Sequence, residues 1–338
     1  MPGDDLVPGF EGVDADRLRL LAEVASLYYE SNYTQSDIAE LLGISRTSVS
    51  RLLSEARDVG IVHITVRRPN PHNINLSAQI KRYFPSIEEV LVVPAGSRGY
   101  PQVVEALGSA AARLLERKLY ENIILGISWN TGVYQVVRAI RAAQQVKATV
   151  VQLTGSAGHA NPIMDGPDLT RWLAQLLGGR YIYLAAPLVV ESQAVRDALL
   201  TERSIADALA LARQINIALV GIGTVFPPLS SLLQTGHISE GELREIIQRG
   251  GVGDILTTFY DINGDVLPID LHHRTIGLSL DTLKDIDCVI GVGASKEKAP
   301  AILGALSGGY LNYLVTDDQA ASAVIDILLN EGDELADE

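Results

Sequence analysis

Two arginines and four hydroxyl side chains are concentrated between Ser45 and Arg51. Arginine binds guanine edges and phosphate oxygens, and hydroxyl groups bond to base edges and phosphates. A short polar face of this kind is what a helix needs in order to bind in the major groove of DNA. The residues that we expect to contact DNA are Thr34, Gln35, Ser45, Arg46, Thr47, Ser48, Ser50 and Arg51.

Local signals between residues 33 and 59 place this polar face on the second helix of a helix-turn-helix. Thr34, with Asp37 three residues later, forms a capping-box pattern. Gly43 allows a tight turn, and Ser45 is a good cap for the second helix. A structural hairpin of two helices would show a similar pattern. The agreement of caps, turn and polar face favours DNA binding over that alternative.

Four strand ends further along the chain carry Gly, Ser, Thr or Asn, which suit the binding of phosphate. They lie at residues 126–132, 153–159, 221–224 and 291–298. Backbone N–H groups at a helix start, and hydroxyls such as those of Ser128 and Thr131, can surround a phosphate oxygen. Lys298 adds a cation. Because the carboxyl ends of parallel strands share one edge of a sheet, we expect one ligand site there.

Two carboxylates, Asp254 and Asp261, could accept hydrogen bonds from ligand hydroxyls, or could equally serve turns and caps. His159 and Arg274 could also approach the ligand, although an ordinary loop histidine and surface arginine are the simpler interpretation. A sugar-phosphate isomerase or deaminase needs a positioned general base, for which only Asp261 and His159 are candidates. Such an enzyme, with an added DNA-binding domain, is therefore an alternative to a binding protein.

Signals for cofactors and metals are weak. The segments GIGTVF and GVGASK begin like a dinucleotide-binding motif but lack its third glycine, and the chain contains no P-loop sequence. Cys288 is the only cysteine and lies in an apolar run, and the histidines are scattered. We therefore expect no cofactor, no metal site and no catalytic residue.

The composition indicates two domains and a local DNA contact. The chain has 338 residues, 47% of them hydrophobic, and a formal net charge of −14. This charge has the wrong sign for a protein that coats nucleic acid. A few arginines in one groove would bind weakly, so we expect a symmetric homo-oligomer, a tetramer built as a dimer of dimers, on repeated half-sites. The apolar runs are short, which predicts a cytoplasmic protein with no membrane partner.

The chain divides into segments by composition. We expect a mobile tail over residues 1–14, a winged helix-turn-helix over 15–68, a linker over 69–76, an α/β domain over 77–330 and an acidic tail over 331–338. The wing would be a strand at 61–68. Short apolar runs, each followed by a helical stretch, predict a parallel sheet covered on both faces, at 88–93, 122–128, 148–155, 181–187, 215–223, 287–293 and 310–317. The Asn-Gly pair in 261–265 predicts a hairpin.

Taken together, the two halves resemble the SorC family of bacterial sugar-responsive transcriptional regulators. The motifs that carry the resemblance are the helix-turn-helix segment 33–62, LGISW at 125–129, GGVGDI at 250–255, FYDINGD at 259–265, and the segments 274–286 and 291–321. The resemblance implies a Rossmann-like effector domain similar to sugar-phosphate isomerases and deaminases. It also implies binding of double-stranded operator DNA under the control of a small phosphorylated sugar.

The resemblance also implies roles for particular residues. The loop Ser128–Gly132, with Thr131, would hold the phosphate, Lys298 would be the nearby cation, and Asp261 would hold sugar hydroxyls. The candidate effector-binding residues are Ser128, Asn130, Thr131, Gly132, Gly155, Ser156, Gly223, Asp261 and Lys298. Two positions depart from the family pattern, because Asn130 follows the tryptophan where a glycine is expected, and Ala294 stands where a second glycine is common. A DNA-binding protein without a ligand is a third alternative.

Overall fold

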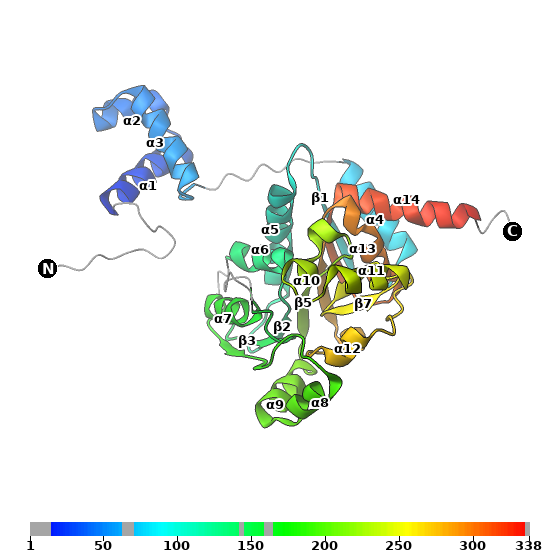
Figure 1. The fold of residues 1–338 in the computed structure, drawn as a ribbon. Coiled ribbons are helices and arrows are strands. Elements are labelled where there is room, and N and C mark those ends of the chain that lie inside the picture. The colour runs from blue at the N-terminus through cyan, green and yellow to red at the C-terminus, as the bar shows by residue number, and fades with distance from the viewer. Residues whose placement is uncertain (1–14, 63–70, 142–144, 159–164, 335–338) are drawn as a thin grey trace. The chain divides into compact units, whose positions relative to one another are not determined.

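The protein consists of two units, seen in a computed structural model (Figure 1). The structure describes residues 15–62, 71–141, 145–158 and 165–334. Contacts within the chain divide it into Met1–Pro69 and Asn70–Glu338. The division lies beside the Pro-Asn segment at which the composition changes, and each unit has its own hydrophobic core.

The smaller unit contains a helix-turn-helix with both expected caps. Its described helices are α1 (Ala15–Tyr29), α2 (Gln35–Leu42) and α3 (Arg46–Asp58). The Thr34 hydroxyl accepts the N–H of Asp37 at 3.2 Å, and the Asp37 carboxylate accepts the N–H of Thr34 at 2.9 Å. Gly43 ends α2 with φ of 65°, and Ser45 caps α3. These local predictions are confirmed.

A small apolar core holds the three helices together. Leu21 of α1, Ile38 of α2 and Val49 of α3 are fully buried in one cluster. The wing expected at 61–68 falls almost entirely on residues 63–70, which lie outside the described residues, and the tail at 1–14 lies outside them too.

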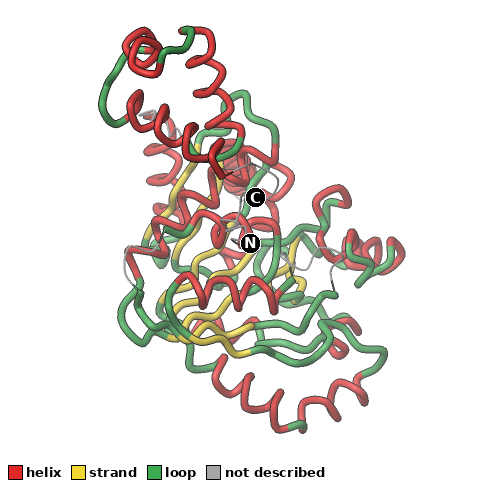
Figure 2. Tube along the Cα trace, turned by 90° about the vertical axis from the view of Figure 1, so that its left-hand side faces the viewer, coloured by secondary structure: helices red, strands yellow, loops and turns green. Residues whose placement is uncertain are grey.

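The larger unit is built on a seven-stranded sheet in which all strand pairs are parallel, as predicted (Figure 2). Its order is β1 (Glu89–Val93), β9 (Tyr313–Asp317), β8 (Cys288–Val292), β5 (Ile217–Gly221), β2 (Ile124–Ile127), β3 (Thr149–Gln152) and β4 (Arg180–Ile182). Strand β5 shows why the runs are apolar throughout: Ile217 and Leu219 join the core on one face, and Ala218 and Val220 join the core on the other.

Helices cover both faces of this sheet. The α-helices are α4 (Pro71–Tyr83), α5 (Tyr100–Lys118), α6 (Thr131–Ala139), α7 (Gly166–Leu176), α8 (Gln193–Thr201), α9 (Arg203–Ala212), α10 (Ser231–Gln234), α11 (Glu240–Gln248), α12 (Asp270–Arg274), α13 (Ala299–Ser307) and α14 (Asp318–Glu334). The 3-10 helices η2 (Pro227–Leu229), η3 (Leu280–Asp285) and η4 (Lys296–Lys298) lie between them. Buried residues of α5, α6 and α7 belong to one core cluster, and those of α4, α13 and α14 belong to the other.

Two expectations about segments need correction. Residues 71–76, expected as linker, begin helix α4, because a proline is well accepted in the first turn of a helix. Residues 331–334, expected as an acidic tail, continue helix α14. The Asn-Gly segment 261–265 reverses the chain as predicted: the N–H of Asp261 donates to the carbonyl of Asp265 at 3.0 Å, and Tyr260 forms an antiparallel bridge with Val266. A further hairpin among the described strands, which the sequence interpretation did not include, joins β6 (Gly253–Ile255) to β7 (Thr258–Tyr260).

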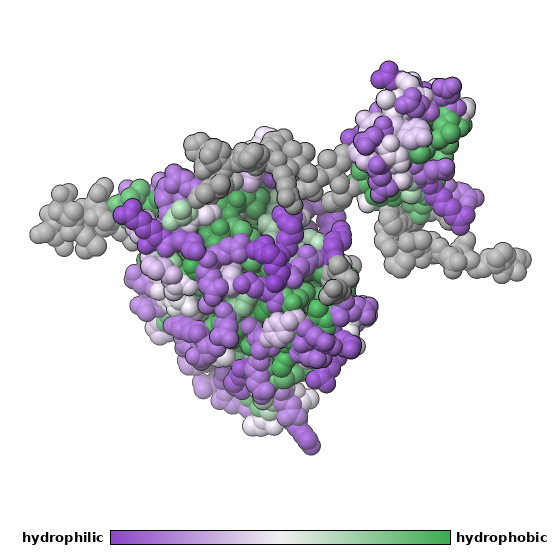
Figure 3. Space-filling model, turned by 180° about the vertical axis from the view of Figure 1, so that it is seen from behind, coloured by the Kyte–Doolittle hydropathy of each residue, from purple (hydrophilic) through white to green (hydrophobic). Residues whose placement is uncertain are grey.

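The face seen in Figure 3 is covered mainly by hydrophilic residues, with smaller hydrophobic areas between them, in keeping with the net charge of −14. Among the described residues, no helix combines the length and apolar character that crossing a membrane requires.

Candidate functional site

A cleft lies where the chain changes direction across the sheet. The chain leaves β2 toward its neighbour β3 on one side and leaves β5 toward its neighbour β8 on the other. At such a switch point the loops separate and leave a crevice at the carboxyl ends of the strands. Two adjoining cavities occupy this crevice, and Asn130 and Ser231 line both of them. We call them the lysine cavity and the aspartate cavity, after Lys298 and Asp254.

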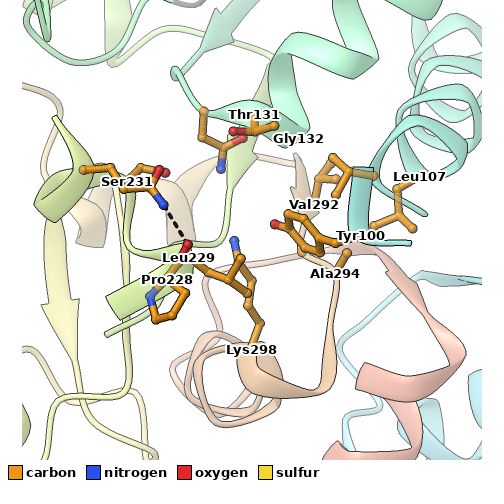
Figure 4. A pocket seen from close by; sticks show the side chains of 14 residues that line it. Tyr100, Leu107, Thr131, Gly132, Pro228, Leu229, Ser231, Val292, Ala294 and Lys298 are labelled. Carbon is orange, nitrogen blue, oxygen red and sulfur yellow. Dashed lines mark hydrogen bonds between the residues drawn. The ribbon is translucent and has the colours of Figure 1, made fainter. Parts of the chain in front are cut away.

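The lysine cavity has a volume of about 180 Å³ and contains a buried cation. Lys298 is 7% exposed, and its Nζ donates to the carbonyl of Ile222 at 2.6 Å. Figure 4 shows its amino group and the Tyr100 hydroxyl pointing into the cavity, with Thr131 and Gly132 on the opposite side. Burial lowers the pKa of Lys298 to about 8, against the attraction of Asp254.

The N-terminal turn of α6 forms another wall of the lysine cavity. Asn130 caps this helix, because its Oδ1 accepts the N–H of Val133 at 2.8 Å. A Cβ on Gly221 would lie 1.4 Å from Asn130 Nδ2, so the glycine at the end of β5 is what lets Asn130 enter the cleft. Thr131 and Gly132 follow as the first helical residues. Free backbone N–H groups and the helix dipole make this wall favourable for an anion.

The aspartate cavity is smaller, about 30 Å³, and contains a carboxylate. Burial raises the pKa of Asp254 to about 6, although Lys298 and the N–H of Thr257 oppose this shift. The Ser128 hydroxyl, also in the cavity, accepts the N–H of Gly221 at 3.2 Å and so links β2 to β5. The cleft thus presents a cation and a helix N-terminus at one end and a carboxylate at the other.

The structure brings together six of the nine predicted effector-binding residues. Those that line the cleft are Ser128, Asn130, Thr131, Gly132, Gly223 and Lys298. Gly223, just beyond β5, gives space to the side chain of Asp254, and Gly221, at the end of β5, gives space to that of Asn130.

Three predicted residues lie outside both cavities. The Asp261 carboxylate accepts the N–H groups of Asn263 and Asp265, both at 2.9 Å, and so closes its own turn. The Ser156 hydroxyl donates to Asp165 at 2.5 Å. Gly155 allows close backbone packing, because a Cβ there would lie 2.3 Å from the carbonyl oxygen of Pro187.

Of the other candidates, Arg274 pairs with Glu242 at 3.0 Å and with Asp270 at 2.8 Å, away from both cavities. His159 lies outside the described residues. The sequence interpretation did not name Tyr100, Ser231 or Thr154, which line the cleft, although Thr154 lies in the strand end 153–159 that it indicated. The Gly- and Ser-containing end of β1, at 94–99, is a signal that could have indicated Tyr100.

The polar face predicted on the second helix of the helix-turn-helix is largely exposed. Arg46, Thr47, Ser50 and Arg51 are exposed on α3. The hydroxyls of Ser45 and Ser48 bond to each other at 2.8 Å. A shallow groove joins the starts of α2 and α3 and is lined by Tyr28, Tyr29, Asn32, Tyr33, Thr34, Gln35, Ser36 and Arg46.

Comparisons with known proteins match both units. Residues 68–326 match the Sugar-bind family, described as "Putative sugar-binding domain", and residues 15–74 match a Crp-like helix-turn-helix domain. The chain is 31% identical to the deoxyribonucleoside regulator of Bacillus subtilis (strain 168), over 94% of this chain and 100% of the relative. It is 33% identical to the transcriptional regulator LsrR of Enterobacter sp. (strain 638), over 94% of this chain and 95% of the relative.

The fold is also similar to that of a regulator whose structure has been solved. The crystal structure of the full-length sorbitol operon regulator SorC from Klebsiella pneumoniae has a TM-score of 0.74 and 29% identity, over 92% of this chain and 100% of that chain. A helix-turn-helix joined to a sugar-binding α/β domain defines a sugar-sensing, DNA-binding transcriptional regulator. The chain belongs to the SorC family of such regulators. The family resemblance and the α/β fold class predicted from the sequence are confirmed.

Proposed function

We propose that a phosphorylated sugar binds in the cleft and controls the affinity of the helix-turn-helix for operator DNA. The observation that supports this most directly is the buried amino group of Lys298 in the same cavity as the N-terminal turn of α6. A buried cation opposite free backbone N–H groups favours an anion such as phosphate. A carboxylate at the other end of the cleft suits hydroxyl groups, which donate hydrogen bonds to it.

We assign particular residues to the two ends of this ligand. Asn130, Thr131, Gly132 and Lys298 surround the phosphate, and Ser128, Gly223 and Asp254 lie toward the sugar. Asp254 takes the role that the sequence interpretation gave to Asp261. The names of two relatives, a sorbitol operon regulator and a deoxyribonucleoside regulator, support a role in carbohydrate metabolism.

At the DNA end, we assign contacts with double-stranded operator DNA to the exposed face of α3 and the starts of α2 and α3. The residues are Thr34, Gln35, Ser45, Arg46, Thr47, Ser48, Ser50 and Arg51. A homotetramer arranged as a dimer of dimers would place several such faces on repeated half-sites. The sugar phosphate would change the affinity for DNA by favouring one arrangement of the subunits over another. This requires that the sugar phosphate bind the two arrangements with different affinities.

We also propose that the cleft binds its ligand without turnover. The relatives are named as regulators, which supports this, and the sequence-predicted base Asp261 is engaged in its own turn. The alternative is an isomerase or deaminase activity on the same sugar phosphate.

Thermal unfolding with a ligand panel tests the proposal. The panel contains ribose 5-phosphate, 2-deoxyribose 5-phosphate, glucose 6-phosphate, fructose 6-phosphate, glucitol 6-phosphate and, as a candidate substrate for deamination, glucosamine 6-phosphate. A compound at a hundred times its Kd stabilises the protein by about 2.7 kcal/mol. We expect at least one to raise the Tm and to change operator affinity in a gel-shift titration, and we expect no new sugar product.

The matched pair Lys298→Met and Lys296→Met removes one positive charge in each case. Lys296 is exposed on the same short helix η4, whereas Lys298 is buried in the cleft. The response to the sugar phosphate should be lost in the first variant and kept in the second. No response of the wild type to any member of the panel would overturn the proposal, and an isomerised or deaminated product would show an enzyme instead.

A further inference from the structure

Thr154, which lines the aspartate cavity, has a hydroxyl group that the described residues leave unsatisfied. Thr154, two residues beyond β3, is 1% exposed and lines this cavity. Among the residues that the structure describes, its Oγ1 has no hydrogen-bond partner and is shielded from solvent. A buried hydroxyl without a partner costs folding free energy, so such groups are rare in native proteins and call for an explanation.

Neighbouring groups hold Thr154 in place from two sides. The amide nitrogen of Gln152 donates to the carbonyl oxygen of Thr154 at 2.7 Å. On the other side, Thr154 forms an antiparallel bridge with Gly277, and the N–H of Leu278 donates to the carbonyl of Leu153 at 2.8 Å. The backbone of Thr154 is therefore anchored beside the cavity.

The size of the aspartate cavity limits what can enter it. A water-sized group needs about 10–15 Å³ of such volume. The cavity offers about 30 Å³, which is enough for one or two hydroxyl groups. Because Asn130 and Ser231 also line the lysine cavity, a ligand whose anionic group lies near Lys298 can extend toward Thr154.

The same cavity contains a strained turn. Leu256 and Thr257, between β6 and β7, have φ of 52° and 65°, and both are buried. A positive φ is unfavourable for a leucine and more so for a β-branched threonine. The N–H of Thr257 bonds to the Asp254 carboxylate, which ties the turn to the ligand end of the cleft. Strain of this kind is concentrated at ligand-binding sites.

We propose that Thr154 is a specificity-determining residue of the effector site, and that its hydroxyl bonds to a hydroxyl of the sugar at the end opposite the phosphate, beside Asp254. This inference rests on the proposed function and narrows the ligand to a sugar monophosphate that carries a hydroxyl at that end. An analogue without that hydroxyl leaves Thr154 unsatisfied and binds less tightly.

The test uses Thr154→Val, which replaces the hydroxyl by a methyl group of similar size. The matched control is Thr316→Val, because Thr316 on β9 is fully buried, its Oγ1 also lacks a partner among the described residues, and it lines neither cavity. Thr154→Ser restores the hydroxyl. Binding of the tightest member of the panel is measured by calorimetry, and the Tm of each ligand-free variant by thermal unfolding.

We expect Thr154→Val to raise the Kd tenfold or more while the Tm without ligand is unchanged or higher. Thr316→Val should leave the Kd unchanged, and Thr154→Ser should bind within about threefold of the wild type. An unchanged Kd in Thr154→Val, or an equal loss in Thr316→Val, would overturn the role of Thr154 while the wild type still binds. Absence of binding by the wild type would instead count against the proposed function itself.

Discussion

The carboxylate of Asp254 lies directly against the backbone of Gly223. A Cβ on Gly223 would be 1.9 Å from Asp254 Oδ1, far closer than any real contact. The glycine stands just beyond β5, and the aspartate belongs to β6 of the small hairpin. The absence of a side chain at one residue thus allows a charged side chain from a distant segment to reach the cleft.

This relationship predicts that Gly223→Ala displaces Asp254 and weakens sugar-phosphate binding by tenfold or more. Gly241→Ala is the control, because its Cβ would meet nothing closer than Ser239 Oγ at 3.7 Å, in helix α11. Calorimetric titration measures both, with circular dichroism to check the fold. A Gly223→Ala variant that folds and binds with the wild-type Kd would show that the Asp254 carboxylate does not hold the ligand.

Replacing Arg46 or Arg51 by alanine should weaken operator binding. Both side chains are exposed on α3. For an arginine that binds a base, we expect a loss of about 1–3 kcal/mol of binding free energy. For an arginine that binds a phosphate, we expect the slope of log K against log salt concentration to become smaller by about one. Arg19→Ala removes an equally exposed charge from α1 and should leave binding unchanged. Fluorescence anisotropy on operator DNA at several salt concentrations measures this, and wild-type affinity in both α3 variants would remove these arginines from the interface.

The protein should lose stability in mild acid because of His272. Its Nε2 accepts the N–H of Phe259 at 2.9 Å, and burial lowers its pKa from 6.5 to about 4. Because the pKa is lower in the folded state, the stabilisation is complete above pH 6.5 and is lost as the pH falls toward 4. The expected loss is roughly 1–3 kcal/mol across this window.

Urea unfolding between pH 7.5 and 4.5 measures this loss. His272→Gln should flatten the pH dependence, whereas His273→Gln, at the exposed neighbouring position, should keep it. An identical pH profile in the wild type and His272→Gln would assign the acid sensitivity to other groups.

Features that depend on near neighbours in the chain could be predicted from the sequence. The capping box needs only Thr34 and Asp37, which are three residues apart. The uninterrupted apolar run of β5 indicates that both faces of this strand are covered. The strand-end loops after β2, β5 and β8 could be placed at one cleft because parallel strands end on one edge. These are local or topological rules, and they hold whatever the detailed packing.

The choice between similar residues could not be predicted. Asp254 and Asp261 are seven residues apart and each was a candidate to bind ligand hydroxyls, yet one enters the cleft and the other closes its own turn. Thr154 belongs to the strand end 153–159 that the sequence indicated, but nothing in the sequence separates it from Gly155 and Ser156, which lie outside both cavities. The sequence by itself determined the family, the parallel sheet and the helix-turn-helix. Only the tertiary structure decided which side chains face the cleft, because that depends on contacts between segments far apart in the chain, such as Gly223 with Asp254 and Gly221 with Asn130.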